Sequence, residues 1–281
     1  MSLAALTRPA AARLREAGVP SPEHDAAELL AHVLGTERAR LPLVDAEAVT
    51  IEAHREYDAL VARRAAREPL QHLTGRAWFR HVELAVGPGV FVPRPETELL
   101  AGWAVEVAAQ LERPVVVDLC TGAGGIAKSI AHEVPQARVH AVELDEPAYR
   151  WAERNLAGTG VDLRLGDAFD AFDDLGGAVD VVVCNPPYVP LEAWESVAPE
   201  ARDHDPHLAL FSGADGLDAI RVLARRAAVL LRPGGVVGVE HADVQGELVP
   251  AVFAATGRWT EVRDHHDLAD RPRWTTARLA P

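Results

Sequence analysis

Cysteine and lysine are both scarce in this chain of 281 residues. Its only cysteines are Cys120 and Cys184, which excludes a disulfide framework and a zinc site built on paired cysteines. The only lysine is Lys128, so nearly all formal positive charge is arginine. Asp plus Glu outnumber Lys plus Arg by 42 to 28, which gives a net charge of −14. Dedicated nucleic-acid binders neutralise phosphates with basic surfaces, so stable nucleic-acid binding is not expected.

Long apolar runs are missing as well. None approaches the roughly 20 residues that a membrane-spanning helix needs, so we expect no membrane partner. The first residues show no basic region followed by an apolar stretch, the pattern of a signal peptide, and we expect a cytoplasmic protein. The length suits one large domain with a smaller companion.

Residues 1–75 are predicted to form a small helical domain. Ser21 is a favourable helix cap, and Pro22 suits the first helical position. Apolar residues then recur at helical spacing as far as Gly35, a natural stop. A second helix is predicted over residues 50–67.

Residues 76–95 are predicted to be a β-hairpin linker between two domains. Residues 78–86 alternate in polarity like a strand. Gly87-Pro88-Gly89 is typical of a turn, and residues 90–92 are expected to form the short return strand.

Residues 96–281 are predicted to form an α/β domain. After a helix over residues 97–111, continuous apolar strands alternate with amphipathic helices. This pattern favours a doubly wound, mostly parallel sheet covered by helices on both faces. Seven strands are expected, at residues 115–119, 138–143, 162–165, 179–184 and 235–240 and near residues 260–263 and 274–279.

A glycine turn follows the first of these strands. Ligands of doubly wound sheets bind beyond the carboxyl ends of the strands, where glycines allow close approach to the backbone. Asp118 precedes Gly122 by four residues, and Gly124 follows two later. This spacing suits S-adenosylmethionine, which carries an amino-acid group that Asp118 could anchor and lacks a pyrophosphate. A dinucleotide site and a tight turn without a ligand are the alternatives.

Two further acids follow the next strands. Glu143 ends the second strand, where an acid can hydrogen-bond ribose hydroxyls. Asp167 follows the third strand, where a carboxylate could accept a hydrogen bond from the adenine amino group. The alternative role of Asp167 is that of a helix cap.

The string Asn185-Pro186-Pro187-Tyr188 after the fourth strand is the most specific feature. Two prolines cannot continue a central strand, so the chain leaves the sheet here. A planar nitrogen has a delocalised lone pair and two N–H donors. The Asn185 side-chain oxygen and the Pro186 carbonyl could accept these donors and direct the nitrogen toward a sulfonium methyl group, while Tyr188 holds the planar group. A rigid turn with a stacked tyrosine is the alternative.

These strings together resemble the HemK/PrmC family of protein-glutamine N5-methyltransferases, which modify peptide chain release factors. The resemblance spans nearly the whole chain, and its most specific string is Pro-Arg-Pro-Glu-Thr-Glu at residues 93–98. The other matching strings lie at residues 68–75, 91–92, 185–188, 210–217 and 232–235.

The resemblance implies a class I methyltransferase fold and a glutamine substrate in a Gly-Gly-Gln motif, gripped in part by the helical N-terminal domain. It places the substrate amide against residues 185–188, with Asn185 also near the cofactor. It implies S-adenosylmethionine as cofactor, S-adenosylhomocysteine as product and no metal. The cofactor contacts implied are Cys120, Thr121, Gly122, Ala123, Gly124, Glu143, Asp167 and Ala168. We expect a monomer.

Three single positions depart from the usual family pattern: Cys120 stands for glycine, Glu143 for Asp, and Ala168 for an aromatic residue. After the fifth strand, the string Glu240-His241-Ala242-Asp243 also differs from the commonest family string. These departures leave open a paralogue with another protein substrate. The alternative functions are an adenine or cytosine N-methyltransferase acting on DNA or RNA, a small-molecule amide methyltransferase, and a binding protein without enzymatic activity.

Overall fold

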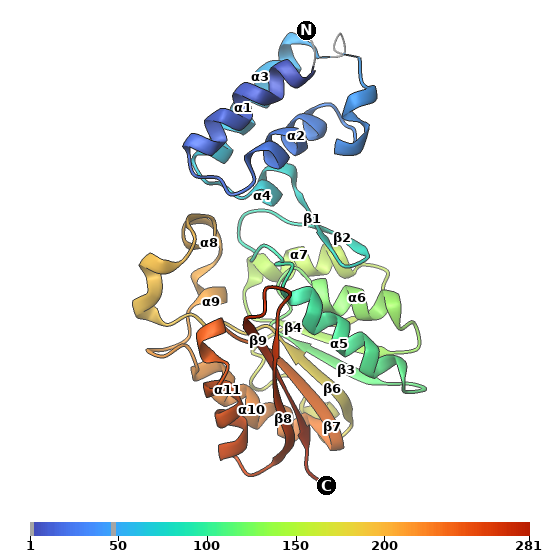
Figure 1. Cartoon of the computed structure of the whole chain (residues 1–281). Coiled ribbons are helices and arrows are strands. Elements are labelled where there is room, and N and C mark those ends of the chain that lie inside the picture. Colours follow the sequence, from blue (N-terminus) through green and yellow to red (C-terminus); the bar gives the residue numbers. More distant parts are fainter. Residues whose placement is uncertain (1–2, 46–48) are drawn as a thin grey trace. The chain divides into compact units, whose positions relative to one another are not determined.

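The computed structural model describes residues 3–45 and 49–281 (Figure 1). Residues 1–2 and 46–48 of the predicted helical domain lie outside the described residues. The chain forms two compact units. The first is Met1–Arg76 with Ala198–His204, and the second is Ala77–Val197 with Asp205–Pro281.

The first unit is helical, as predicted. Ser21 occupies the cap position of its second helix, although its side chain makes no capping hydrogen bond. Thr50 caps the third helix by accepting a hydrogen bond from the Ala53 backbone nitrogen at 3.1 Å. The helices are α1 (Leu3–Glu16), α2 (Pro22–Val33), α3 (Ile51–Ala65), α4 (Leu70–Thr74), α8 (Pro199–His204) and the 3-10 helix Arg38–Leu43.

The linking hairpin exists, but the prediction that it closes at Gly87-Pro88-Gly89 is wrong, since the turn at residues 88–89 lies after the hairpin. Its strands are β1 (Arg76–Phe79) and β2 (Val82–Ala85), and the turn is Arg80-His81. Residues 90–92 form no strand. Arg80 adopts a left-handed φ of +50°, and its guanidinium makes two 2.7 Å hydrogen bonds to Glu133. This tertiary anchor allows an arginine where the local sequence favours the glycines that follow.

The second unit contains a seven-stranded sheet in the order β5-β4-β3-β6-β7-β9-β8. Strands β3 to β7 pair in parallel, and β9 pairs antiparallel with both β7 and β8. All seven predicted strands are present, although the last three are longer than predicted. The strands are β3 (Val115–Leu119), β4 (Arg138–Glu143), β5 (Asp162–Leu165), β6 (Val179–Cys184), β7 (Leu231–Glu240), β8 (Trp259–His266) and β9 (Pro272–Leu279).

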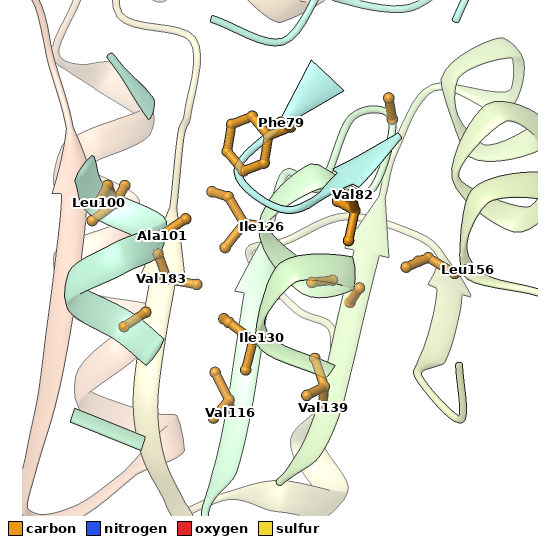
Figure 2. Close-up of a cluster of buried hydrophobic side chains, with 14 of the residues drawn as sticks. Phe79, Val82, Leu100, Ala101, Val116, Ile126, Ile130, Val139, Leu156 and Val183 are labelled. Carbon is orange, nitrogen blue, oxygen red and sulfur yellow. The ribbon is translucent and has the colours of Figure 1, made fainter. Parts of the chain in front are cut away.

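Helices cover both faces of this sheet, which confirms the doubly wound arrangement. One buried cluster joins the sheet to the hairpin and three helices (Figure 2). These helices are α5 (Thr97–Ala109), α6 (Gly125–Glu133) and α7 (Glu146–Leu156). The cluster on the other face involves α10 (Asp218–Leu230) and α11 (Leu248–Ala255).

The two faces of β3 explain why this strand is apolar at every position except Asp118. Val116 packs in the first cluster, whereas its neighbours Val115 and Val117 pack in the second. Since the chain proceeds from β3 outward to β5 and returns to β6 on the other side, the order of strands reverses between β3 and β6. Ligands bind beyond the carboxyl ends of strands at such a reversal.

Candidate active site

The glycine loop after β3 is held from beneath by Asp118. This side chain is fully buried, and its Oδ2 accepts hydrogen bonds from the Thr121 hydroxyl at 2.6 Å and the Ala127 backbone nitrogen at 3.1 Å. Asp118 thereby ties the loop to the start of α6. Burial raises the pKa of Asp118 to about 7, and the two hydrogen bonds oppose the rise. Its buried Oδ1 makes no hydrogen bond within the described residues.

The loop backbone is open on one side. Gly122 and Gly124 adopt left-handed φ values of +57° and +87°. A Cβ added at Gly122 would meet nothing within 4 Å, whereas at Gly124 it would lie 3.1 Å from Leu156. Gly124 therefore allows close packing, and Gly122 leaves room for a ligand beside the backbone.

Glu143 reaches from β4 to this same loop. Its Oε2 accepts from the Gly122 backbone nitrogen at 2.8 Å, and its Oε1 accepts from the Asp145 backbone nitrogen at 2.9 Å. Burial raises the pKa of Glu143, while these hydrogen bonds oppose the rise. The carboxylate thus shapes the loop and retains lone pairs for ribose hydroxyls.

Cys120 begins the loop with a φ of +60°, a conformation that favours glycine. Its thiol interacts with that of Cys184 at the end of the neighbouring strand β6. Burial raises the pKa of the Cys184 thiol well above its usual value, so this group stays protonated. The two cysteines are free thiols that pack at the carboxyl edge of the sheet.

Asp167 follows β5 and caps a turn. Its Oδ1 accepts from the Phe169 backbone nitrogen at 2.9 Å, and its carbonyl accepts from the Ala171 nitrogen at 2.9 Å. Ala168 is buried beneath this turn. No helix begins directly after Asp167, so the helix-cap role considered for it is absent, and its contact with adenine stays a prediction.

The turn Asn185 to Tyr188 leaves β6 at the carboxyl edge. The Asn185 Nδ2 donates a hydrogen bond to the Thr97 hydroxyl at 3.2 Å. The Tyr188 hydroxyl donates to Glu240 Oε1 at 3.1 Å. Pro186 is buried between them, and Pro187 is partly exposed.

Thr97 and Glu240 were absent from the sequence-based list of site residues. Thr97 begins α5, and Glu240 ends β7; both are buried. Burial raises the pKa of Glu240 to about 7, and interactions with the Thr97 and Tyr188 hydroxyls oppose the rise. Burial and Glu240 raise the pKa of Tyr188, so its hydroxyl stays a donor. Thr97 lies in the Pro-Arg-Pro-Glu-Thr-Glu string, which was a signal that could have identified it.

The segment after α9 (His207–Leu210) supports the same turn. Val189 forms a bridge with Phe211, and the Tyr188 carbonyl accepts from Gln245 Nε2 at 3.1 Å. Gly216 lies so close that an added Cβ would be 2.2 Å from the Tyr188 oxygen. This contact explains the glycine at this position.

The residues at the strand ends fit the predicted cofactor. Room beside Gly122 and the unpaired buried oxygen of Asp118 suit a ligand with a cationic amino-acid group. Among residues 3–45 and 49–281, no group of three or more His, Cys, Asp or Glu side chains could hold a metal ion. No helix in this part of the chain is long and apolar enough to cross a membrane.

Comparisons with known proteins agree with this geometry. Residues 95–200 match the methyltransferase small domain, and residues 5–75 match the PrmC N-terminal domain. The hMettl16 catalytic domain, solved with the MAT2A 3'UTR hairpin 6, shares the fold with a TM-score of 0.57 at 15% identity, covering 79% of this chain and 81% of that one. A methyltransferase from Pyrococcus furiosus has a TM-score of 0.50 at 17% identity, with 80% and 98% covered. The protein is therefore an S-adenosylmethionine-dependent methyltransferase with the class I fold.

Curated relatives narrow this class. The release factor glutamine methyltransferase of Streptomyces coelicolor is 59% identical over 270 residues, covering 95% of each chain. That of Mycolicibacterium smegmatis is 49% identical, covering 95% of this chain and 94% of its own. The chain belongs to the family of release factor glutamine methyltransferases. A Streptomyces pristinaespiralis relative, the 4-amino-L-phenylalanine/4-methylamino-L-phenylalanine methyltransferase, is 49% identical over 205 residues, covering 71% and 70%.

Proposed function

We propose that this protein methylates the side-chain amide nitrogen, N5, of the glutamine in the Gly-Gly-Gln motif of peptide chain release factors. The observation that carries the proposal is the turn Asn185 to Tyr188, which lies at the carboxyl edge of the sheet next to the glycine loop. Release factor glutamine methyltransferases match this chain over both of its units. A release factor acts on the ribosome, so the proposed activity is cytoplasmic.

In this proposal the cofactor supplies an electrophilic methyl group on a sulfonium centre. Cys120 to Gly124 would hold its amino-acid part, with Asp118 facing the ammonium group. Glu143 would bind the ribose hydroxyls, and Asp167 with Ala168 would border the adenine. Asn185 also borders the cofactor because it lies at the end of the strand beside the loop.

The substrate amide needs orientation more than a strong base. The Asn185 side-chain oxygen and the Pro186 carbonyl would each accept one N–H of the substrate amide, and proline fixes the direction of that carbonyl. Tyr188 would pack on the amide plane together with Pro187. The nitrogen becomes acidic once it bonds to the methyl carbon, and its proton then passes to water.

The helical first unit is proposed to bind the body of the release factor. Its match to the PrmC N-terminal domain supports this division of labour, with residues 1–75 for recognition, 76–95 as linker and 96–281 for catalysis. We propose a monomeric enzyme without a metal.

One relative supports a second candidate function, which is N-methylation of a small aromatic amine. The 4-amino-L-phenylalanine methyltransferase acts on a planar nitrogen and matches 71% of this chain. The release factor enzymes match 95%, so we place a release factor first. No comparable observation favours a DNA or RNA substrate.

The test is transfer of a radiolabelled methyl group from S-adenosylmethionine to a purified release factor. We expect label on the wild-type factor and none on a factor whose Gly-Gly-Gln glutamine is alanine. Label on 4-amino-L-phenylalanine or on RNA, with none on the release factor, would overturn the proposal.

A further inference from the structure

Behind the turn Asn185 to Tyr188 lies a network of partly buried hydrogen bonds. The Asn185 nitrogen donates to the Thr97 hydroxyl at 3.2 Å, and Tyr188 donates to Glu240 at 3.1 Å. The Thr97 hydroxyl also interacts with the Glu240 carboxylate, whose Oε2 makes no hydrogen bond within the described residues. Thr97 is 5% exposed and Glu240 is 1% exposed, so water does not compete for these groups.

The direction of these hydrogen bonds follows from the number of protons that each group carries. A hydroxyl carries one proton and can accept hydrogen bonds at the same time. A carboxylate only accepts, so the Thr97 proton points toward Glu240. Thr97 can then only accept from Asn185, and the Asn185 amide must turn its nitrogen toward Thr97. The Asn185 oxygen is thereby left for another donor.

The orientation of this amide decides what the site can bind. An oxygen facing the substrate accepts an N–H from a planar nitrogen, whereas a flipped amide would oppose one N–H donor with another. Glu240 also holds the Tyr188 hydroxyl, so one buried carboxylate fixes both ends of the four-residue turn. Neither Thr97 nor Glu240 needs to touch the substrate for this effect.

We propose that Thr97 and Glu240 are positioning residues that lock the Asn185 side-chain oxygen toward the methyl acceptor. The part that concerns catalysis rests on the proposed function. The amide orientation itself can be observed in the free enzyme, so the two can fail separately.

The sequence offers a direct way to observe this orientation. Its only asparagines are Asn155 and Asn185, so protein labelled with 15N-asparagine gives two side-chain amide signals. Asn155 donates from Nδ2 to the carbonyls of Ala85 and Ala123, at 2.9 Å each, and serves as an internal reference. Asn185→Ala assigns the second signal by removing it.

The variants are Thr97→Val, which keeps the shape but removes the hydroxyl, and Thr97→Ser, which restores it. Thr260→Val, on the edge strand β8, is a matched control because the Thr260 hydroxyl bonds only locally, to the Arg278 carbonyl at 3.3 Å. We expect the Asn185 amide protons to be protected from exchange in wild type and Thr97→Ser. Thr97→Val should lose this protection while Asn155 keeps it. An unchanged Asn185 signal in Thr97→Val would overturn the proposed lock.

Methyl transfer provides the second readout. Thr97→Val should lower kcat by about 10- to 100-fold, the scale of a misplaced reacting group, with unchanged affinity for S-adenosylmethionine. Thr97→Ser should recover most of this loss, and Thr260→Val should match wild type. Thr97→Val should not further slow Asn185→Ala, because the two residues act through one group.

Equal kcat values in wild type and Thr97→Val, or additive losses in the double variant, would overturn the catalytic part. If wild type transfers no methyl group to the release factor, the proposed function fails, and the exchange experiment still decides the lock.

Discussion

We expect the pH dependence of catalysis to follow the ionisation of one buried carboxyl group, that of Glu240. The Tyr188 hydroxyl donates a hydrogen bond to it, the Thr97 hydroxyl interacts with it, and the charges of Arg273 and Glu96 act on it with opposite sign. Burial raises its pKa to about 7. Once protonated, Glu240 can donate to Thr97, and the hydrogen bond that orients Asn185 is no longer enforced.

We therefore expect kcat to fall as pH drops through about 7, because the active form carries the ionised Glu240. Glu240→Gln cannot titrate, so its kcat should be lower but insensitive to pH in this range. The measurement is kcat of both proteins over a range from about pH 5.5 to about pH 9. If Glu240→Gln keeps the wild-type profile, another group, such as Asp118, controls the rate.

The raised pKa of Glu240 affects the free energy of unfolding in the opposite direction to catalysis. Glu240 binds its proton more tightly in the folded protein than in the unfolded chain, where its pKa is near the usual 4.5. Its stabilising contribution is full below that value and is lost as pH rises through about 7. The residue that orients the site thus carries a cost in stability at the pH where the enzyme works.

The sequence alone predicted the candidate site residues at the strand ends but not the residues that hold their side chains in place. Asp118, Glu143 and Asn185 could be found because each lies in or directly after the carboxyl end of an apolar strand. For Thr97 the only signal was its place in the Pro-Arg-Pro-Glu-Thr-Glu string, and Glu240 had none. The roles of both depend on three elements meeting: the start of α5, the end of β7 and the turn after β6.

At the scale of elements, the turn Asn185 to Tyr188 is supported by the loop around Gly216. A Cβ added at Gly216 would lie 2.2 Å from the Tyr188 backbone carbonyl oxygen and 2.8 Å from Gln245 Nε2. The Gly216 backbone has a φ of +77°. Alanine at this position must therefore displace the turn as well as strain the backbone.

Gly216→Ala should lower kcat by about 10²-fold, since small displacements of positioning groups have effects of this size. Gly177→Ala is the matched control, because Gly177 has a φ of +70° but an added Cβ would meet nothing within 4 Å. Both variants should lose about 1–2 kcal/mol of unfolding free energy from backbone strain. Steady-state kinetics and urea unfolding measure the two effects. Equal kcat in both variants would show that Gly216 serves only backbone conformation.

Helices and strands were predicted correctly where apolar residues recur with a clear period. The prediction failed where a contact between residues distant in sequence determines the position of a turn. The parallel strands and Thr97–Ala109 followed from apolar patterning. The hairpin turn was placed at Gly87–Gly89 because glycine and proline mark turns, yet it forms at Arg80-His81. The ion pair between Arg80 and Glu133 holds the turn at this place, and those residues lie 53 positions apart.

At the scale of the molecule, a segment of the second half of the sequence belongs to the helical unit. Ala198–His204 clusters with the first 76 residues. Glu200 accepts hydrogen bonds from Arg64 at 2.9 Å and from Arg67 at 2.6 Å, and Arg64 also pairs with buried Asp25 at 2.7 Å. Ala198–His204 is thereby anchored in the helical unit, a feature that no local pattern predicted.

Glu200→Gln should reduce the unfolding free energy by about 1–3 kcal/mol, less than for a fully buried pair because Glu200 is partly exposed. Its two arginine partners lower the pKa of Glu200 to about 2 against the opposing effect of burial. The stabilisation is therefore full above the usual pKa of 4.5 and is lost as pH falls toward 2. Urea unfolding at pH 7 and pH 3 measures this, with exposed Glu195→Gln as control. A difference from wild type that is the same at both pH values would contradict an ionic origin.

The central claim is that Asn185 directs a glutamine amide in a release factor toward the methyl donor. The most direct test is mass spectrometry of the Gly-Gly-Gln peptide after reaction with wild type and with Asn185→Ala, with cofactor affinity measured by calorimetry. The account predicts one added methyl group on the glutamine with wild type, a rate lower by about 10²- to 10³-fold with Asn185→Ala, and similar cofactor affinity in both. A methyl group on another residue, or Asn185→Ala at more than about half of the wild-type rate, would contradict it.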